Sequence, residues 1–271
     1  MSADSTAVPD YFRRIRLDDQ VWIVLGAGNG IGRQTSHALS QAGAAVVCVD
    51  VDPTRAETVA SEVDGTAMVA DVTRRAAVEA LFADISAKVG PPRGLVDIVG
   101  MPVIGHLDEL ADEQWARQFE LVLGHSFLAL QIGGREIARS GGGSMVFVGS
   151  NSGLAHMAGM LAYGTAKAAL HHLVGSAARD LAPSGVRVNA VAPGLTRTPR
   201  LEAGLDDGAW RRAAQHIPRG SAATPDEIAS VILFLAGDLS SYVTGHVLVA
   251  DGGRVGTIAG SVTSPPQGSV T

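Results

Sequence analysis

Cys48 is the only cysteine among the 271 residues, so the chain cannot form an internal disulfide. Basic residues are also in the minority. The chain has 21 Lys and Arg against 27 Asp and Glu, which gives a formal net charge of −6, and no long basic run occurs. This balance argues against partners such as nucleic acid or an anionic lipid surface.

Long apolar runs are missing as well. A membrane span needs roughly 18 to 20 apolar residues, whereas the strongest apolar windows here are short, such as 231–236. The first ten residues, MSADSTAVPD, lack the basic region and apolar run of a secretion signal. We therefore expect a cytoplasmic protein without a membrane partner. Its 46% hydrophobic content and mean hydropathy of +0.20 need another explanation.

Seven short apolar runs rich in β-branched residues supply that explanation. They are continuous rather than alternating, which is typical of strands buried on both faces of a parallel sheet. The segments between them have helical spacing, so strand and helix alternate as in βαβ units. The predicted strands are 21–25, 45–49, 66–70, 95–99, 144–148, 186–191 and 246–249, and the predicted helices are 31–42, 53–63, 74–89, 112–139, 161–181 and 225–236. The sequence therefore predicts an α/β fold, with a doubly wound Rossmann-type parallel sheet of about seven strands and helices on both faces.

We find no break in composition and no internal repeat, so we expect one domain, 17–255, between an N-terminal arm, 1–16, and a flexible tail, 256–271. Residues 195–223 form a long connection that contains several Pro and Gly residues. A connection of this length is typical of a lid over a binding site.

The segment 26–32, with the sequence GAGNGIG, joins the first predicted strand to the first predicted helix. Such a turn directs free backbone N–H groups and the positive end of the helix dipole at one point, and its glycines allow a pyrophosphate to approach. A tight turn without a ligand is the alternative, because Arg33 replaces the last glycine of the usual GxGxxG spacing. The candidate cofactor contacts in this turn are Gly26, Asn29, Gly30, Ile31 and Gly32.

Asp50 ends the second predicted strand, about 20 residues after the turn. A carboxylate at this place can accept hydrogen bonds from a ribose diol, and its charge would repel a 2′-phosphate. Neither Asn29 nor Val51 supplies the cation that a phosphorylated cofactor requires. The residues therefore favour NAD over NADP.

Tyr163 and Lys167 are four residues apart in a predicted helix, so they share one helical face. A free phenol has a pKa near 10 and needs a nearby cation to act as a base at neutral pH. Lys167 can provide that cation. Ser150 ends the fifth predicted strand and can hold a substrate oxygen against the phenol.

The order of a Gly-rich turn, an acidic strand end, a strand-end Ser and a YxxxK pair resembles the short-chain dehydrogenase/reductase family over about 17–253. The resemblance implies hydride transfer with a nicotinamide cofactor, with Ser150, Tyr163 and Lys167 as catalytic residues and Lys167 also at the nicotinamide ribose. The segments 187–189 (RVN), 193–198 (PGLTRT) and 242–253 also match the family. Further cofactor contacts implied by the resemblance are Asp71, Val72, Val99, Gly100, Tyr163, Pro193, Gly194, Thr196 and Thr198.

Three positions depart from the family pattern. Leu25 replaces a Thr before the turn, and Asp97 and Ile98 replace an Asn pair. Val122 aligns with an Asn that helps to hold the water of a proton relay, and a Val side chain cannot hydrogen-bond. Backbone carbonyls then hold that water, or proton exchange is slower. His125 is a possible substitute, although a packed or solvated His is the simpler interpretation.

Other chemistries find little support. The sequence has no HExxH or CxxC spacing, so we predict no metal site. The segment 149–153 reads GSNSG, with Asn where the GxSxG of a serine hydrolase has its nucleophile. A GxxxxGK[ST] phosphate loop is absent.

We therefore expect an NAD-dependent oxidoreductase that interconverts a secondary alcohol and a ketone. The alternatives are a cofactor-binding regulatory protein with weak or no turnover, for which Val122 is the main argument, and a 3-oxoacyl thioester reductase. Dehydration or epimerisation through a transient ketone is a further possibility on the same site.

The substrate is expected to be a hydrophobic alicyclic, aromatic or lipid-like molecule, because the segments that border the site are mostly apolar. The candidate substrate residues are Ser152, Leu154, Met157 and Trp210. The long helices 112–139 and 161–181 resemble those that pair in the family's oligomers, so a homotetramer or homodimer is expected.

Overall fold

The structure is a computed structural model, and it describes residues 7–255. The predicted flexible tail, 256–271, and the first part of the predicted N-terminal arm lie outside the described residues. None of the described helices is both long enough and apolar enough to cross a bilayer.

A seven-stranded sheet with the order β3-β2-β1-β4-β5-β6-β7 forms the centre of the molecule. Every neighbouring pair of strands is parallel. The strands are β1 (Val21–Leu25), β2 (Ala45–Asp50), β3 (Thr66–Val69), β4 (Pro92–Asp97), β5 (Gly143–Val148), β6 (Val186–Pro193) and β7 (Val247–Ala250). This confirms the predicted fold class, and the strand bounds differ from the predicted ones by at most three residues at an end.

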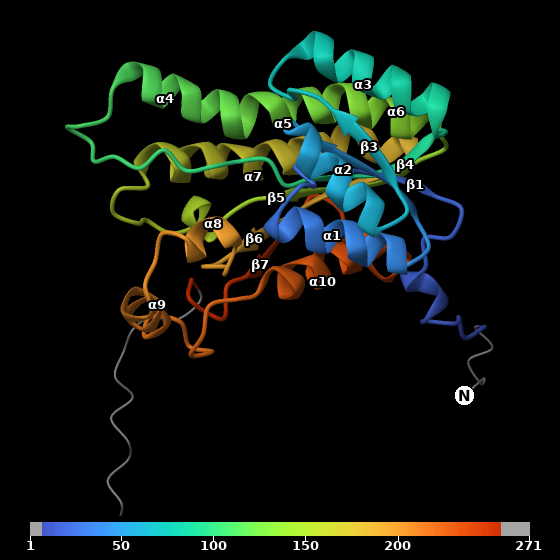
Figure 1. Cartoon of the computed structure of the whole chain (residues 1–271). Coiled ribbons are helices and arrows are strands. Elements are labelled where there is room, and N and C mark those ends of the chain that lie inside the picture. Colours follow the sequence, from blue (N-terminus) through green and yellow to red (C-terminus); the bar gives the residue numbers. More distant parts are fainter. Residues whose placement is uncertain (1–6, 256–271) are drawn as a thin grey trace, which may run out of the picture.

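Helices cover both faces of the sheet (Figure 1). One layer holds α3 (Arg75–Lys88), the run from α4 (Asp112–Phe119) through α6 (Gly134–Arg139), and α7 (Leu161–Leu181). The other holds α1 (Gly30–Gln41), α2 (Pro53–Glu62) and α10 (Pro225–Ala236). Ile23 of β1 faces the first layer and Trp22 faces the second, so the strand is apolar on both sides. The buried sheet thus accounts for the positive mean hydropathy.

The residues at the helix starts explain where these helices begin. Asp52 caps α2 by accepting the N–H groups of Thr54 (2.9 Å) and Arg55 (3.3 Å). At α10, the Glu227 carboxylate accepts the backbone N–H of Thr224 at 2.9 Å, which completes a capping box. Such caps satisfy N–H groups that have no partner within the helix.

The predicted helix 112–139 is continuous, but it contains two π-helical segments, η2 (Glu120–Gly124) and η3 (Ala129–Gly133), on either side of α5 (His125–Leu128). Single π turns frequently occur at functional sites. Val122 lies in η2, and its side chain is fully buried.

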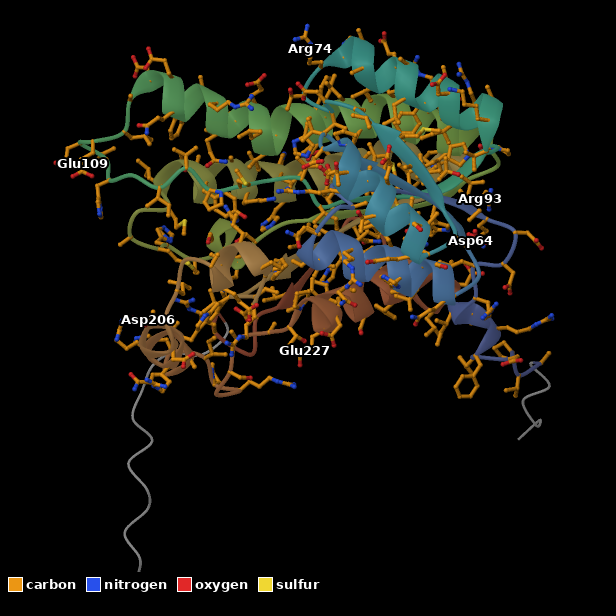
Figure 2. The ribbon with its side chains drawn as sticks, in the orientation of Figure 1. Asp64, Arg74, Arg93, Glu109, Asp206 and Glu227 are labelled. Carbon is orange, nitrogen blue, oxygen red and sulfur yellow. The ribbon has the colours of Figure 1, made fainter. Side chains whose placement is uncertain are left out.

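All seven strands point their carboxyl ends toward the same edge of the sheet. Arg93 and Asp64 lie near the beginnings of β4 and β3, and Glu109 and Asp206 lie in connections that follow β4 and β6 (Figure 2). Figure 2 places the first pair and the second pair at opposite ends of the molecule. The strand order reverses between β1 and β4, and open α/β sheets bind ligands at the carboxyl edge of such a switch point.

The predicted lid, 195–223, contains two short helices, α8 (Pro199–Glu202) and α9 (Asp207–Ala214). A bridge between Thr196 and Ala223 joins the two ends of this segment. The Arg197 guanidinium pairs with Glu202 at 3.2 Å and lies 4.8 Å from the centre of the Trp210 ring. These contacts hold α8 and α9 together.

Candidate active site

The glycine-rich turn leaves β1 and enters α1 with three glycines that no other residue can replace without strain. Gly26 and Gly30 have φ angles of +80° and +52°. A Cβ atom on Gly32 would lie 2.0 Å from the Gly26 carbonyl oxygen, so α1 can approach the turn only without a side chain there. Asn29 caps α1 by accepting the Gly30 N–H at 2.8 Å. The turn therefore has the backbone geometry expected of a phosphate cradle.

Asp50, at the end of β2, faces this turn. Its carboxylate accepts the N–H groups of Gly28 (3.0 Å) and Asp52 (3.1 Å). A Cβ atom on Gly28 would lie 2.6 Å from the Asp50 carboxylate and 2.5 Å from Cβ of Arg55. The absence of a side chain at Gly28 therefore leaves room for both residues. Gly28 and Arg55 were not among the residues predicted for this site. Arg55 could have been predicted only by assuming that the first turn of α2 lies against the Asp50 carboxylate.

Ser150 lies at the carboxyl edge of the sheet, between β5 and the short helix η4 (Asn151–Gly153). Its hydroxyl accepts the Ser152 N–H at 3.1 Å, which fixes the serine at the beginning of η4. The Ser150 side chain also lowers the pKa of Tyr163, as a neighbouring hydroxyl can. Two of the three predicted catalytic side chains therefore lie close together.

His171 supports this loop from α7. Its Nε2 accepts the Ser150 N–H at 3.4 Å, and a Cβ atom on Gly149 would lie 2.4 Å from the same nitrogen. Burial, and then the charge of Lys167, lower the pKa of His171 to about 4, so the imidazole is neutral at physiological pH. This contact was not predicted from the sequence. No spacing rule connects His171 to Ser150.

Tyr163 and Lys167 project from the first turns of α7 into the same region. The Lys167 ammonium donates to the Val148 carbonyl at 2.7 Å and lies 5.7 Å from the centre of the Tyr163 ring. Burial raises the pKa of Tyr163, whereas the Ser150 hydrogen bond and the Arg200 charge lower it. Burial lowers the pKa of Lys167 to about 8, and the Asp97 carboxylate opposes that effect.

The Asp97 carboxylate, at the end of β4, is the centre of a buried polar cluster. It accepts the Ser126 hydroxyl at 3.0 Å and the Val99 N–H at 3.1 Å, and it lies 3.0 Å from His125 Nε2. His125 is fully buried, and its Nδ1 has no hydrogen-bond partner within residues 7–255. His125 is therefore packed rather than solvated.

The end of β6 completes the site. Gly194 packs against Asp251 so closely that a Cβ atom on it would lie 2.8 Å from the Asp251 Cα atom. The Thr196 hydroxyl donates to the Gly194 carbonyl at 3.1 Å. Gly30 is similarly close to Thr198, whose Cγ2 atom would lie 3.3 Å from a Cβ atom there. The segment after β6 thus lies against the turn after β1.

A cavity of about 1290 Å³ connects these elements. Most predicted contacts line it: Gly26, Asn29, Gly30, Ile31, Asp50, Gly100, Ser150, Ser152, Met157, Tyr163, Lys167, Pro193, Gly194, Thr196 and Thr198. Several predicted residues lie outside this lining: Gly32, Asp71, Val72, Val99, Leu154 and Trp210. Leu154 lines a neighbouring cavity of about 450 Å³, and Trp210 is a buried residue of α9 within the lid. Asp71 is exposed and accepts the Thr73 hydroxyl at 2.6 Å.

The residues present fit a nicotinamide dinucleotide. One end of the cavity offers a turn without Cβ atoms and a carboxylate, and the other offers a phenol, an ammonium and a hydroxyl. Within residues 7–255, no group of three His, Cys, Asp or Glu side chains is arranged to hold a metal ion.

Comparison with known proteins gives consistent matches over nearly the whole chain. Residues 26–254 match the family model described as enoyl-(acyl carrier protein) reductase. The chain is 33% identical to a 3-oxoacyl-[acyl-carrier-protein] reductase of Thermotoga maritima, over 89% of this chain and 100% of the relative. It is 38% identical to the cis-4-hydroxycyclohexanecarboxylate dehydrogenase of Sinomonas cyclohexanicum, over 87% of this chain and 96% of the relative. The chain belongs to the short-chain dehydrogenase/reductase family.

A solved structure of the family agrees with the fold. A 7α-hydroxysteroid dehydrogenase in complex with NADH and 7-oxo glycochenodeoxycholic acid superposes with a TM-score of 0.84 at 30% identity. The match covers 89% of this chain and 96% of that one. The resemblance inferred from the motifs is therefore confirmed, and with it membership in a family of oxidoreductases.

Two of the departures from the family pattern, Asp97 and Val122, lie close together. Asp97 and Val122 are both buried on the side of β4 that faces α7. A Cβ atom on Gly100 would lie 3.2 Å from Lys167 Nζ and 3.8 Å from Cγ2 of Val122. In this chain an apolar side chain and a carboxylate bound to His125 thus adjoin the lysine.

Proposed function

We propose that this protein is an NAD-dependent oxidoreductase that interconverts a secondary alcohol and a ketone. One observation carries the proposal. Ser150, Tyr163 and Lys167 line the same cavity as the glycine-rich turn and Asp50, so a cofactor bound along it ends beside the phenol.

Each of the predicted catalytic residues has a defined role in this reaction. Tyr163 takes the proton of the substrate hydroxyl at its phenolic oxygen, while Ser150 orients the substrate oxygen. Lys167 stabilises the phenolate by its charge and binds the nicotinamide ribose. A bound nicotinamide supplies the hydride acceptor in oxidation and the hydride donor in reduction. Gly26, Gly30 and Thr198 would hold the pyrophosphate of such a cofactor.

The electrostatics of the site support these tasks. Burial raises the pKa of Tyr163, so the phenol needs help to lose its proton. That help comes from the Ser150 hydrogen bond and from positive charge nearby, which both lower the pKa. An ammonium with a pKa of about 8 is mostly charged at pH 7 and can still exchange its proton.

The preference for NAD rests on Asp50. Its carboxylate lies at the cavity surface beside the turn, where it can accept hydrogen bonds from a ribose diol and repel a 2′-phosphate. Arg55 lies next to it, but pairs with Asp52 at 3.4 Å. We infer that the carboxylate dominates cofactor choice.

The substrate end of the cavity favours an alicyclic, aromatic or lipid-like skeleton. Its lining includes Met101, Pro102, Met157, Leu195 and Leu201. Two of the relatives are named for ring substrates, a hydroxycyclohexanecarboxylate and a steroid acid. We place the reaction in the cytoplasm, in a homotetramer or homodimer.

Two rivals have specific support. The similarity to a 3-oxoacyl-[acyl-carrier-protein] reductase favours reduction of 3-oxoacyl thioesters. The buried Val122 favours a cofactor-binding regulatory protein with weak or no turnover, because that side chain cannot help to hold a relay water.

The decisive experiment is a screen of secondary alcohols with NAD⁺ and NADP⁺, followed by absorbance of the reduced cofactor, and of 3-oxoacyl thioesters in the reverse direction. We expect NADH from at least one ring alcohol and a preference for NAD⁺. Cofactor binding by calorimetry without turnover on any alcohol would support the regulatory protein. Turnover confined to the thioesters would support the reductase.

A further inference from the structure

The cavity carries a charge opposite to that of the chain. The whole chain has a formal net charge of −6. Among residues 7–255, the cavity lining nevertheless contains four cationic side chains, Arg55, Lys167, Arg200 and Arg254, against one carboxylate, Asp50. A cavity with excess charge of one sign concentrates ligands of the other sign. The ligands of this cavity are therefore expected to be anionic.

Two of these cations already have partners. Arg55 pairs with Asp52 at 3.4 Å, and Lys167 donates to the Val148 carbonyl at 2.7 Å. Arg200 and Arg254 differ from them, because neither guanidinium has an ion pair or a hydrogen bond within residues 7–255. The Asp50 carboxylate accepts the Gly28 and Asp52 N–H groups beside the turn, and within residues 7–255 it has no ion pair with either guanidinium.

Arg200 is the cation of the lid that faces the reaction centre. It lies in α8, two residues after Thr198, and its charge acts on the Tyr163 phenol. The neighbouring Arg197 instead pairs with Glu202 and lies over Trp210. Arg200 thus lines the same cavity as Tyr163, and no carboxylate of the described part of the chain pairs with it.

The walls around these two groups are apolar. Leu195 and Leu201 come from the lid segment, and Met157 and Met160 come from the loop before α7. A ligand that fills this space needs an oxygen for Tyr163, a hydrocarbon body for the walls and an anionic group for Arg200. A planar carboxylate matches a guanidinium with two parallel hydrogen bonds.

We propose that Arg200 binds a carboxylate of the substrate, and that the substrates are hydroxy acids and keto acids with an alicyclic or aromatic body. The proposal rests on the proposed dehydrogenase function and deepens it. Arg200 is then a specificity-determining residue, which selects acids over neutral alcohols of the same shape. Burial raises the pKa of Tyr163, and the positive charge of Arg200 lowers it, which favours the phenolate.

A binding experiment tests this without turnover. The full chain, saturated with NADH, is titrated by calorimetry with cyclohexanecarboxylate and with cyclohexanecarboxamide. We expect the acid to bind at least about tenfold more tightly than the amide, as one charge-assisted bidentate contact allows. In Arg200→Gln the acid should lose that advantage, while the affinities for the amide and for NADH stay the same.

Arg211→Gln is the matched control, because it removes one positive charge from α9 of the same lid without touching the cavity. It should keep the preference for the acid. The proposal is overturned if the wild-type protein does not bind the acid or does not prefer it, or if Arg200→Gln weakens acid and amide equally. A loss of NADH affinity in Arg200→Gln would also overturn it and assign the guanidinium to the cofactor phosphates. None of these results depends on turnover, so a failure of the dehydrogenase assay is recognised separately.

Discussion

Asp50 and Arg55 are neighbours of opposite charge beside the glycine-rich turn, and both line the cavity. We propose that the balance between these two charges sets the choice between NAD and NADP. A Cβ atom on Gly28 would contact both, which shows how closely they adjoin the turn. Sequence spacing indicated Asp50 because it ends a strand. It could not indicate Arg55, because the approach of α2 to the turn is a tertiary contact.

Replacing Asp50 by Ala should relax the discrimination against NADP. The change removes the charge that repels a 2′-phosphate and leaves Arg55 in place to attract it. Loss of the hydrogen bonds to the Gly28 and Asp52 N–H groups lowers activity with both cofactors. The activities with NAD and NADP must therefore be compared with each other. We expect the ratio of kcat/KM for NAD to that for NADP to fall by about tenfold or more. Adding Arg55→Gln to Asp50→Ala should reverse part of the gain in activity with NADP. An unchanged ratio in Asp50→Ala would refute the assignment of Asp50 to the ribose.

The alkaline limit of activity should depend on Asp97. Lys167 must stay protonated to stabilise the phenolate, and its pKa of about 8 predicts that activity falls as the pH rises through about 8. Asp97 raises the pKa of Lys167, so Asp97→Asn should lower it further. We expect the alkaline limb of the kcat profile to move to lower pH by about one unit. Ser126→Ala removes a hydrogen bond to Asp97 but keeps its charge, and should leave the limb in place. If the limb does not move in Asp97→Asn, the carboxylate has no influence on the lysine.

At the scale of the elements, the packing of α7 beneath η4 fixes Ser150, and the neutral imidazole of His171 is part of that packing. Gly149 and Gly153 leave room for the ring, since a Cβ atom on either would lie within 2.8 Å of it. The sequence predicted α7 and the strand end from their patterns. It could not predict this contact, because the two elements meet only in the folded chain.

The packing of His171 predicts a loss of stability in acid. Its pKa is lowered from 6.5 to about 4, so the unfolded chain takes up a proton before the folded chain does. The corresponding stability is complete above pH 6.5 and is lost as the pH falls toward 4. Thermal denaturation between pH 7 and 4 should show a steeper decrease in Tm for the wild type than for His171→Leu. Equal slopes in the two proteins would mean that His171 does not titrate in this range.

At the scale of the whole molecule, much of the fold could be predicted because the βαβ pattern repeats along the entire chain. The seven apolar runs and the helices between them correspond to observed elements. The π-helical segments within 112–139 could not be predicted, because a π turn changes the local register without changing the composition. Trp210 was expected at the pocket from its place in the lid, yet it packs beneath Arg197.

The proposed oligomer can be tested on the outer surface of the long helix. Trp115 on α4 and Phe127 on α5 remain 40% and 45% exposed. We expect the wild-type chain to have a multiple of its 27.8 kDa mass in light scattering, and Phe127→Asp to lower that mass by placing charge in an apolar contact. Phe12→Asp, on the exposed N-terminal arm, is the control and should not change the mass. A monomeric wild type would exclude this assembly.

The central claim is that Tyr163 exchanges the substrate proton beside a bound cofactor, and Tyr163→Phe tests it most directly. The change removes only the phenolic oxygen, so the fold and the cavity should persist. With the best alcohol from the screen, we predict that turnover falls by about a thousandfold or more while NADH binds with nearly unchanged affinity in calorimetry. Turnover close to that of the wild type would contradict the assignment of Tyr163 and with it the proposed mechanism.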